Sequence, residues 1–371
     1  MVLRPLAPWL PVAATVAIRL VVIAVTGQTS EPWLDPDNYL ARAIALNSGA
    51  PWMSALTDIE GLIVPPLYSA FLAVMLRFGV EPLMMLVVQC ALAGVACAAL
   101  VHAATLMAGK RGAIAAGWLF ALMPSTVMAA PAFWSEALFV PLWIGGVALL
   151  VEAVSRPTAR AVLLAGIVLA AAALTRSIAV FATPMMLLPL VSRAPGRRVA
   201  IQVGVVFVAI VGAYVAIASM QSGRLVIVDN SAEWHWTGRT NTSVARSSGP
   251  SSVPVLIVRE FSHAPFAAGR ESLARVRVAF SRTLWNRPSW LGPTMRQVLE
   301  MANVLLLAVM VAGAACGFSR HRRDPRARVL LACVAAQILL ISLSAANSSP
   351  RYRAPIEPVL LVLAAAAIPR V

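Results

Sequence analysis

The sequence RHRRDPRAR, residues 320–328, places five arginines between two apolar runs, residues 298–318 and 329–346. Each run is long enough for a helix to cross the hydrocarbon core of a bilayer, which takes about 20 residues. Short arginine-rich loops between such helices remain on the cytoplasmic side of the membrane. This stretch therefore predicts two membrane-spanning helices joined by a cytoplasmic loop.

The composition of the whole chain extends this prediction. Of its 371 residues, 60% are hydrophobic and 12% are charged, and the mean hydropathy is +0.82, values outside the range of ordinary soluble domains. A net charge of +15 would suggest nucleic-acid binding in a soluble protein, but here the basic residues lie in loops between apolar runs, where they set orientation. We expect an all-α polytopic membrane protein with no large soluble domain and no nucleic-acid partner.

The first apolar run follows Arg4 and ends near Thr26. No clear small-residue cleavage site precedes the acidic segment after it, so we expect a retained first span and not a removed signal peptide.

The four cysteines all fall inside apolar runs, and their spacing is not that of a metal site. They are Cys90, Cys97, Cys316 and Cys333. We interpret them as core residues without disulfides. The sequence indicates no cofactor, although it leaves a divalent metal open.

Counting spans outward from the cytoplasmic loop places residues 222–297 and 347–354 outside the cytoplasm. The second short basic loop, SRAPGRR at residues 192–198, falls inside, as the same count requires. Residues 28–64, which are acidic, then lie outside. The predicted organisation is an N-terminal membrane module (1–221) with its acidic loop (28–64), a long extracytoplasmic segment (222–297) and C-terminal spans (298–371).

Residues 65–192 contain six apolar candidates, whereas the two assigned ends require an odd number of crossings. One candidate must be broken, re-entrant or fused with its neighbour. The strongest suspects are residues 112–130, with Pro124, and residues 161–192, which Arg176 interrupts. Non-helical backbone at membrane depth is tolerated only where it lines a cavity, so such a break could border a site.

The acidic loop contains WLDPDNYLARAIAL, residues 33–46. Asp35 followed by Pro36 is typical of a helix start, with Asp35 as the cap and Asp37 in the first turn. Tyr39 would then lie on one face of a short interfacial helix. The alternative is that one of the two carboxylates acts as a general base at the membrane surface.

Three further side chains within or next to apolar runs are candidates for lining a substrate cavity. Glu136 and Arg176 are ionisable residues among spans, which favours a functional role, although the two could also pair with each other or extend to the interface. Tyr68 lies in the aromatic interface zone, where an ordinary helix entry would also explain it.

Arg351 and Arg353 lie next to an apolar helix that is expected to begin near Pro355. A helix N-terminus together with arginine forms an anion site, and phosphate is the natural ligand at a membrane surface. The alternative is a basic anchor for lipid headgroups. Glu357 could also pair with one of the arginines.

Six stretches, in this order, resemble the GT-C glycosyltransferases, especially the bacterial family 39 branch that is similar to protein O-mannosyltransferases and aminoarabinose transferases. They are DPDNYLARA (35–43), VPPLYSAFLAVMLRFG (64–79), FWSEALFVPLWI (133–144), ALTRSIAVFATPMMLLPL (173–190), VDNSAEWHWTGRTNTS (228–243) and SSPRYRAPIEPVLLVLAA (348–365). The resemblance covers nearly the full length. It implies a GT-C-like helical bundle with short interfacial helices in its extracytoplasmic loops.

The resemblance also implies a reaction. A sugar would pass, with inversion, from a polyprenyl-phosphate donor to a glycan, lipid or protein acceptor on the extracytoplasmic face of the plasma (inner) membrane. Asp35 matches the presumed base of the family best, and Asp37 is the second choice. Arg351, Tyr352 and Arg353 match plausible contacts for the lipid phosphate. The DPDN sequence departs from the commoner Asp-Glu pair, which leaves the base and any metal open.

A membrane transporter or lipid-linked sugar flippase is the alternative from another class, because broken helices and buried charges are also transporter features. Transporters commonly contain repeated halves, and this chain has none that we detect. The position of the acidic and basic motifs discriminates between the two readings: an enzyme of this type needs them at the extracytoplasmic surface, a transporter near the bilayer midplane.

Overall fold

The computed structural model describes residues 8–26, 35, 37–57, 63–192, 194–223, 225–228, 262, 265–281, 292–343 and 353–369. In these residues the chain is mainly helical, and it includes an isolated antiparallel β-bridge between Thr57 and Ile63. The helices are α1 (Leu10–Thr26), α2 (Tyr39–Asn47), α3 (Trp52–Leu56), α4 (Pro66–Arg77), α5 (Pro82–Ala108), α6 (Lys110–Ala121), α7 (Pro124–Met128), α8 (Glu136–Ser155), α9 (Ala159–Thr175), α10 (Ile178–Val191), α11 (Ala194–Ser222), α15 (Pro265–Ala279), α16 (Pro293–His321), α17 (Pro325–Leu343) and α18 (Ile356–Ala365).

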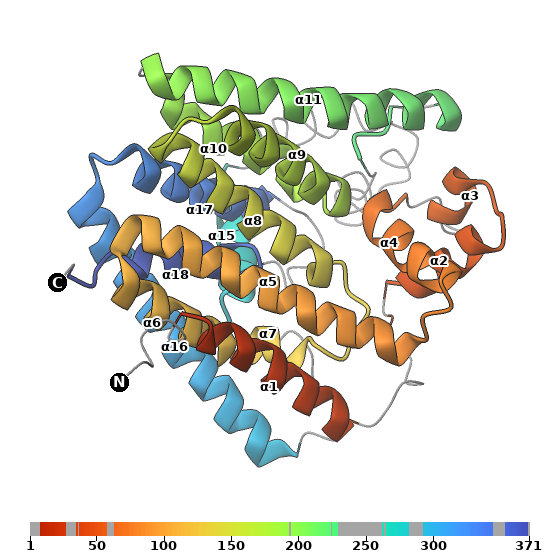
Figure 1. Ribbon diagram of the computed structural model, residues 1–371, viewed down its shortest axis with the longest axis horizontal. Helices are drawn as coiled ribbons and strands as arrows, with labels where there is room; N and C mark the ends of the chain where they lie inside the picture. The colour runs from red at the N-terminus through yellow and green to blue at the C-terminus, as the bar shows by residue number, and fades with distance from the viewer. Residues whose placement is uncertain are drawn as a thin grey trace.

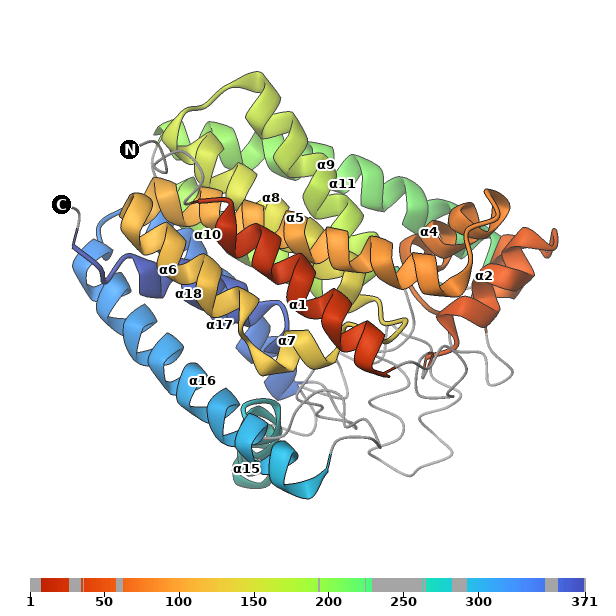
Figure 2. The ribbon, with the colours of Figure 1, turned by 60° about the horizontal axis from the view of Figure 1, so that its bottom comes forward.

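Five of these helices, α5, α8, α11, α16 and α17, are long and apolar enough to cross a membrane. They form one bundle with the shorter apolar helices α1, α9, α10 and α18 (Figures 1 and 2). The predicted all-α polytopic membrane fold is therefore confirmed. The predicted spans 298–318 and 329–346 correspond to α16 and α17.

Helices α2, α3 and α4 lie together at one end of the bundle, on the right in Figure 1. Arg42 of α2 connects them by donating a hydrogen bond to the carbonyl of Leu56 in α3 (2.8 Å). Tyr39, Leu56, Tyr68 and Leu72 pack with the first half of α5 in a second, smaller apolar core.

Helices α4 and α6 each have only 12 residues and extend about 18 Å, less than the thickness of the hydrocarbon core. Of the two, α4 packs on α2 at the end of the bundle, so we infer that α4 is the candidate that does not cross. The sequence had pointed instead to residues 112–130 or 161–192. Both segments do break, at Met123 and at Arg176, but in each case the chain passes into another packed helix.

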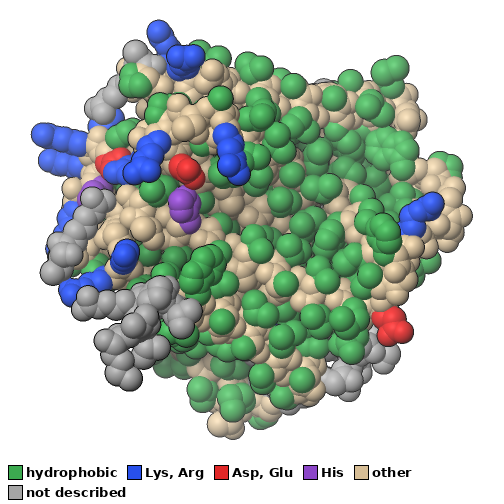
Figure 3. Space-filling view, in the orientation of Figure 1, with side chains coloured by type: hydrophobic (Ala, Val, Ile, Leu, Met, Phe, Trp, Pro, Cys, Tyr) green, Lys and Arg blue, Asp and Glu red, His purple; other side chains and the backbone are tan. Residues whose placement is uncertain are grey.

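Basic side chains visible in Figure 3 gather at the opposite end of the bundle, on the left. Arg326, at the start of α17, organises this end. Its guanidinium forms an ion pair with Asp324 (2.6 Å) and donates hydrogen bonds to the carbonyl of Leu106 in α5 and the hydroxyl of Ser155 in α8. The ends of α5 and α8 and the start of α17 therefore share one basic surface.

Helix α18 is buried in the middle of the bundle, between α5, α6, α16 and α17. Small residues on its neighbours permit this position. A Cβ atom on Gly317 of α16 would overlap the carbonyl of Leu363, and one on Gly112 of α6 would lie 2.8 Å from the carbonyl of Ala365. Close backbone approach at glycine is the usual way in which helices pack in lipid, where no hydrophobic effect drives them together.

A single methyl group at Gly317 should therefore destabilise the bundle. We expect Gly317→Ala to lower the free energy of unfolding by about 1–3 kcal/mol, the typical cost of overpacking. The matched control is Gly212→Ala in α11, where a Cβ atom meets nothing within 4 Å; it should leave stability unchanged or raise it by up to about 1 kcal/mol. Unfolding in detergent micelles measures both, and equal stability of the two variants would contradict the packing argument.

Candidate functional site

Asp35 holds the start of α2. Its Oδ1 accepts a hydrogen bond from the backbone N–H of Tyr39 (2.6 Å), and its Oδ2 accepts from those of Leu40 (2.9 Å) and Ala41 (3.3 Å). These N–H groups belong to the first turn of the helix and have no partner within it. The side chain of Asp35 therefore caps the helix as predicted, although Asn38 and not Asp35 occupies the N-cap position.

The details of the cap differ from the sequence prediction. The helix begins at Tyr39 and not at Pro36, because Asn38 adopts a left-handed conformation (φ 57°) and ends a turn in which its N–H donates to the carbonyl of Asp35. Asp37 therefore precedes the helix and is not part of its first turn. Asparagine and aspartate tolerate this conformation better than other side chains, so the local sequence permits the turn.

The environment of Asp35 makes its carboxylate more basic than that of an exposed aspartate. Partial burial raises the pKa of Asp35, and the neighbouring Asp37 charge adds to this effect. The three backbone hydrogen bonds act in the opposite direction, but the net shift is upward. A carboxylate with a raised pKa is a better proton acceptor.

Tyr39 and Tyr68 pack edge to face with their ring centroids 5.0 Å apart. Both are buried, and the hydroxyl of Tyr68 donates to Oε1 of Gln89 in α5 (3.2 Å). Burial raises the pKa of Tyr39 to about 12; the carboxylates of Asp37 and Glu136 add to the shift, whereas Arg176 and a hydrogen bond with Ser135 oppose it. The Tyr39 hydroxyl thus lies among polar groups from three separate parts of the chain.

Glu136 and Arg176 form an ion pair (2.5 Å) between the start of α8 and the end of α9. Arg176 also donates to the hydroxyl of Ser135 (3.2 Å) and lies over the ring of Phe139, 6.0 Å from its centroid. The pairing that the sequence left open is confirmed. Glu136 is 4% exposed, so the pair is sheltered from water and its geometry is constrained.

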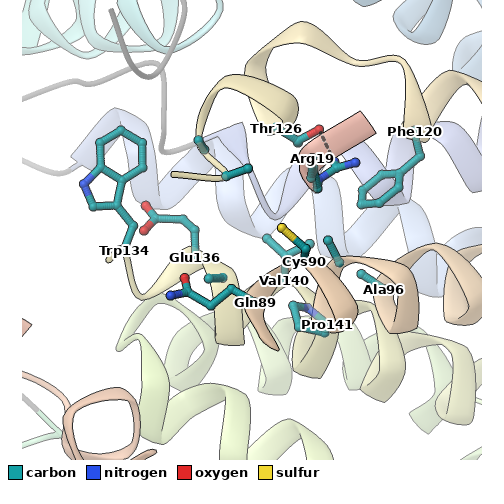
Figure 4. Close-up of a pocket in the computed structure, with 14 residues that line it drawn as sticks. Arg19, Gln89, Cys90, Ala96, Phe120, Thr126, Trp134, Glu136, Val140 and Pro141 are labelled. Atoms are coloured by element: carbon teal, nitrogen blue, oxygen red, sulfur yellow. Dashed lines mark hydrogen bonds between the residues drawn. The ribbon is translucent and has the colours of Figure 1, made fainter. Parts of the chain in front are cut away.

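A small pocket with a volume of about 60 Å³ lies next to this ion pair (Figure 4). Figure 4 shows Glu136, Gln89 and Trp134 on one side of the pocket and Arg19 with Thr126 on the other. The sequence analysis missed Gln89 and Arg19. An arginine in the middle of an apolar run was nevertheless a usable signal, since an ionisable residue within a span is rarely accidental.

Arg353 is fully buried at the start of α18. Its Nε donates to Glu357 (2.6 Å), and one of its terminal nitrogens donates to the carbonyls of Ala279 (3.1 Å) and Ser281 (2.7 Å) at the end of α15. The expectation that Glu357 pairs with one arginine of the motif is confirmed. The other terminal nitrogen, NH2, is buried and has no hydrogen-bond partner among the described residues.

The structure thus brings Asp37, Tyr39, Tyr68, Glu136 and Arg176 together near the capping residue Asp35, and it places Arg353 in a separate network. Arg351 and Tyr352 lie outside the described residues. In the part of the chain that is described, no group of three His, Cys, Asp or Glu side chains could hold a metal ion.

Comparison with protein families identifies a similarity over the middle of the chain. Residues 64–221, from just before α4 to the end of α11, match the family described as dolichyl-phosphate-mannose-protein mannosyltransferase. A comparison with curated protein sequences gave no match.

Solved structures similar to this chain include ArnT from Cupriavidus metallidurans in the apo state, with a TM-score of 0.59 and 17% identity over 96% of this chain and 59% of that one. The archaeal oligosaccharyltransferase AglB from Archaeoglobus fulgidus, in complex with an inhibitory peptide and a dolichol-phosphate, matches with a TM-score of 0.52 and 16% identity over 96% of this chain and 46% of that one. The apo form of the A. fulgidus oligosaccharyltransferase matches with a TM-score of 0.58 and 17% identity over 96% and 50%.

The chain therefore spans about half the length of these proteins. Both ArnT and AglB are glycosyltransferases of the GT-C fold, and the match includes almost every helix described above. This chain is a multi-pass membrane protein with the GT-C fold.

Proposed function

We propose that this protein is a membrane glycosyltransferase that moves a sugar, with inversion, from a polyprenyl-phosphate donor to a glycan, lipid or protein acceptor, and that Asp35 is the general base. The observation that carries the proposal is the partly buried carboxylate of Asp35, fixed by three backbone N–H groups at one end of the bundle, beside a cluster of polar side chains. The proposal extends the resemblance in fold to an activity.

The distribution of charge supports an extracytoplasmic position for Asp35. Basic residues gather at the end of the bundle organised by Arg326, and the positive-inside rule assigns that end to the cytoplasm. Helix α2 lies at the other end. In a bacterial cell the protein would then be in the plasma (inner) membrane, with its site facing outward.

The hydrogen bonding of Asp35 leaves room for an acceptor. A carboxylate has about four lone-pair directions, and the backbone N–H groups occupy three, two of them on Oδ2. Oδ1 therefore retains a direction in which it can accept the proton of an acceptor hydroxyl. The acceptor oxygen attacks the anomeric carbon, the bond from that carbon to the phosphate oxygen breaks, and the phosphate leaves with the electron pair.

The polar cluster of Tyr39, Ser135, Glu136 and Arg176 supports the binding of a sugar near this base. Tyr39 begins α2, Ser135 and Glu136 lie at the start of α8, and Arg176 follows the end of α9. The hydrogen bond from Arg176 to Ser135 and the ion pair between Arg176 and Glu136 fix the directions of these side chains near Tyr39. A few convergent polar groups in an otherwise apolar surrounding are typical of small-molecule sites.

The leaving phosphate needs positive charge and not a strong acid, because a phosphate is already a stable anion. Arg351, Tyr352 and Arg353 are our candidates for this role. Most of the Arg353 guanidinium is committed to Glu357 and to backbone carbonyls, so the unpartnered NH2 nitrogen is the group left to contact a phosphate. The presence of dolichol-phosphate in the AglB structure supports a lipid-phosphate donor.

The alternative reading, a transporter or lipid-linked sugar flippase, requires the acidic motif near the bilayer midplane. Helix α2, whose first turn Asp35 holds, lies at the end of the bundle next to the last visible turn of α5 at that end (Figure 1). This position favours the enzyme.

Asp35→Asn tests the general base. We expect kcat/KM to fall by about 100-fold or more, whereas Asp37→Asn should stay active.

Because the base must be ionised, wild-type activity should fall as the pH drops through the pKa of Asp35, which lies above 3.8. Removing the like charge of Asp37 lowers that pKa, so the acid limb of the Asp37→Asn profile should move to lower pH. Release of free polyprenyl phosphate from a panel of radiolabelled polyprenyl-phosphate sugars gives the profiles.

Asparagine has one acceptor oxygen and cannot replace both oxygens of Asp35 in the cap, so thermal stability must be measured for each variant. If Asp37→Asn alone is inactive at matched stability, Asp37 is the base. If both variants are active, the acidic loop has no catalytic role.

Arg353 can be tested with a double-mutant cycle. Glu357→Gln alone should destabilise the protein by about 3 kcal/mol or more, because it leaves a buried arginine without a carboxylate. The double variant Arg353→Met, Glu357→Met should recover much of that loss. If Arg353 also contacts the donor phosphate, the folded double variant will have a raised KM for the donor. A wild-type KM would restrict Arg353 to a structural role and leave the phosphate to Arg351.

A further inference from the structure

The turn between α16 and α17 carries two exposed arginines, Arg322 and Arg323. Their side chains have no hydrogen-bond or ion-pair partner among the described residues. Neighbouring arginines hold the backbone of this turn instead. Arg326 pairs with Asp324 (2.6 Å), and Nε of Arg328 donates to the carbonyl of Arg322 (3.0 Å). The turn therefore has a defined conformation and presents two cations to its surroundings.

Four further exposed cations lie at neighbouring helix ends, two at the start of α6 and two beside the turn from α8 to α9: Lys110, Arg111, Arg156 and Arg160. Within the described part of the chain, these side chains also have no ionic or hydrogen-bond partner. Arg326 joins their turns to the turn after α16, because its guanidinium contacts the carbonyl of Leu106 in α5 and the hydroxyl of Ser155, the last residue of α8. These six cations form what we call the basic surface, at the left of Figure 3.

The carboxylates at this end of the bundle do not neutralise the basic surface. Among the described residues they are Asp324 and Glu152, and both already have partners. Asp324 pairs with Arg326, and Oε2 of Glu152 lies 3.0 Å from Nε2 of His102. The basic surface therefore keeps a strong positive charge, which can attract an anionic partner from outside the chain.

The turns that carry the cations are short, which fixes their distance from the membrane. One residue separates α5 from α6, residues 156–158 separate α8 from α9, and residues 322–324 separate α16 from α17. Because α5, α8, α16 and α17 are long and apolar enough to cross a membrane, cations at their ends lie at the level of the lipid headgroups. A nucleic acid would have to approach the negatively charged membrane surface to reach them, so this position favours a lipid.

We propose that the basic surface binds anionic phospholipids of the leaflet that it faces, which is the cytoplasmic one by the positive-inside rule. Guanidinium groups match phosphate oxygens with a planar fork of donors, and clusters of cations next to spanning helices attract anionic lipids. An open cleft of about 470 Å³ at residues 319–324 is large enough for a headgroup. The basic surface lies at the opposite end of the bundle from α2 and Asp35, so the binding does not depend on the proposed transfer reaction.

Native mass spectrometry of the purified full-length protein in detergent tests the proposal. The probes are dioleoyl phosphatidylglycerol, which is anionic, dioleoyl phosphatidylcholine, which has the same chains and no net charge, and a short DNA oligonucleotide. We expect the anionic lipid to bind about tenfold or more tightly than the neutral lipid. Because salt screens exposed charges, this preference should shrink as the ammonium acetate concentration rises from about 0.05 to 0.5 M. The oligonucleotide should bind more weakly than the anionic lipid.

Two double variants assign the binding to the basic surface. Arg322→Gln with Arg323→Gln removes two of its cations. The matched control, Arg270→Gln with Arg277→Gln, removes two exposed arginines from α15, which contacts the other end of α17. The first double variant should bind phosphatidylglycerol about tenfold or more weakly than the wild type, whereas the control should bind it as the wild type does.

Lys110→Gln with Arg111→Gln, on the neighbouring turn, takes the place of the first double variant if that protein does not fold. Wild-type binding of phosphatidylglycerol by a folded variant of the basic surface, or equal weakening in the α15 control, would overturn the proposal. Equal binding of the two lipids, or tighter binding of the oligonucleotide, would also overturn it. Asp35→Asn should bind phosphatidylglycerol normally even if it has lost turnover, so a failure of this proposal and a failure of the transfer reaction give different results.

Discussion

The buried ion pair between Arg353 and Glu357 is the interaction on which the centre of this bundle depends. It lies at the start of α18, the helix that is surrounded by α5, α6, α16 and α17. Two charges in such a place are tolerated only because their hydrogen bonds are nearly complete. Arg353 also donates to two carbonyls at the end of α15, and Glu357 accepts from the hydroxyl of Ser125 in α7 (3.2 Å). One ion pair thus joins three helices that are far apart in the sequence.

Helix α7 extends this connection toward the candidate site. It has only five residues, yet Ser125 contacts Glu357 and the next residue, Thr126, accepts from Arg19. The network at the start of α18 and the pocket beside Glu136 are therefore joined through adjacent side chains of one short helix. Successive side chains of a helix point about 100° apart, so these two adjacent residues of α7 reach partners in different directions.

The two ends of the molecule differ in their electrostatics, and each arrangement follows from its surroundings. At the basic end, arginines such as Arg326 satisfy carbonyls at the helix C-termini, where a cation is favourable. At the other end, Asp35 satisfies N–H groups at a helix N-terminus, where an anion is favourable. The charges at each end of the bundle thus suit the partial charges of the helix ends that they contact.

The sequence by itself determined the class of the protein and part of the site. Apolar runs longer than the bilayer core and short arginine-rich loops such as residues 320–328 are local properties, and a bilayer permits few other structures for them. The capping role of Asp35 was also predictable, since it depends on residues only four to six positions away. Glu136 and Arg176 were recognisable as unusual, because a charge next to an apolar run needs a reason.

Only the tertiary structure decided which groups these residues meet. The ion pair of Glu136 with Arg176 joins two helix ends 40 positions apart, and the Arg353 network reaches back to Ser125. Helix α4 is apolar, but its packing against α2 holds it at the end of the bundle. No spacing rule in the sequence encodes such contacts, because they depend on how whole helices approach one another. Small residues at positions such as Gly317 determine that approach, because they let the backbones of two helices touch.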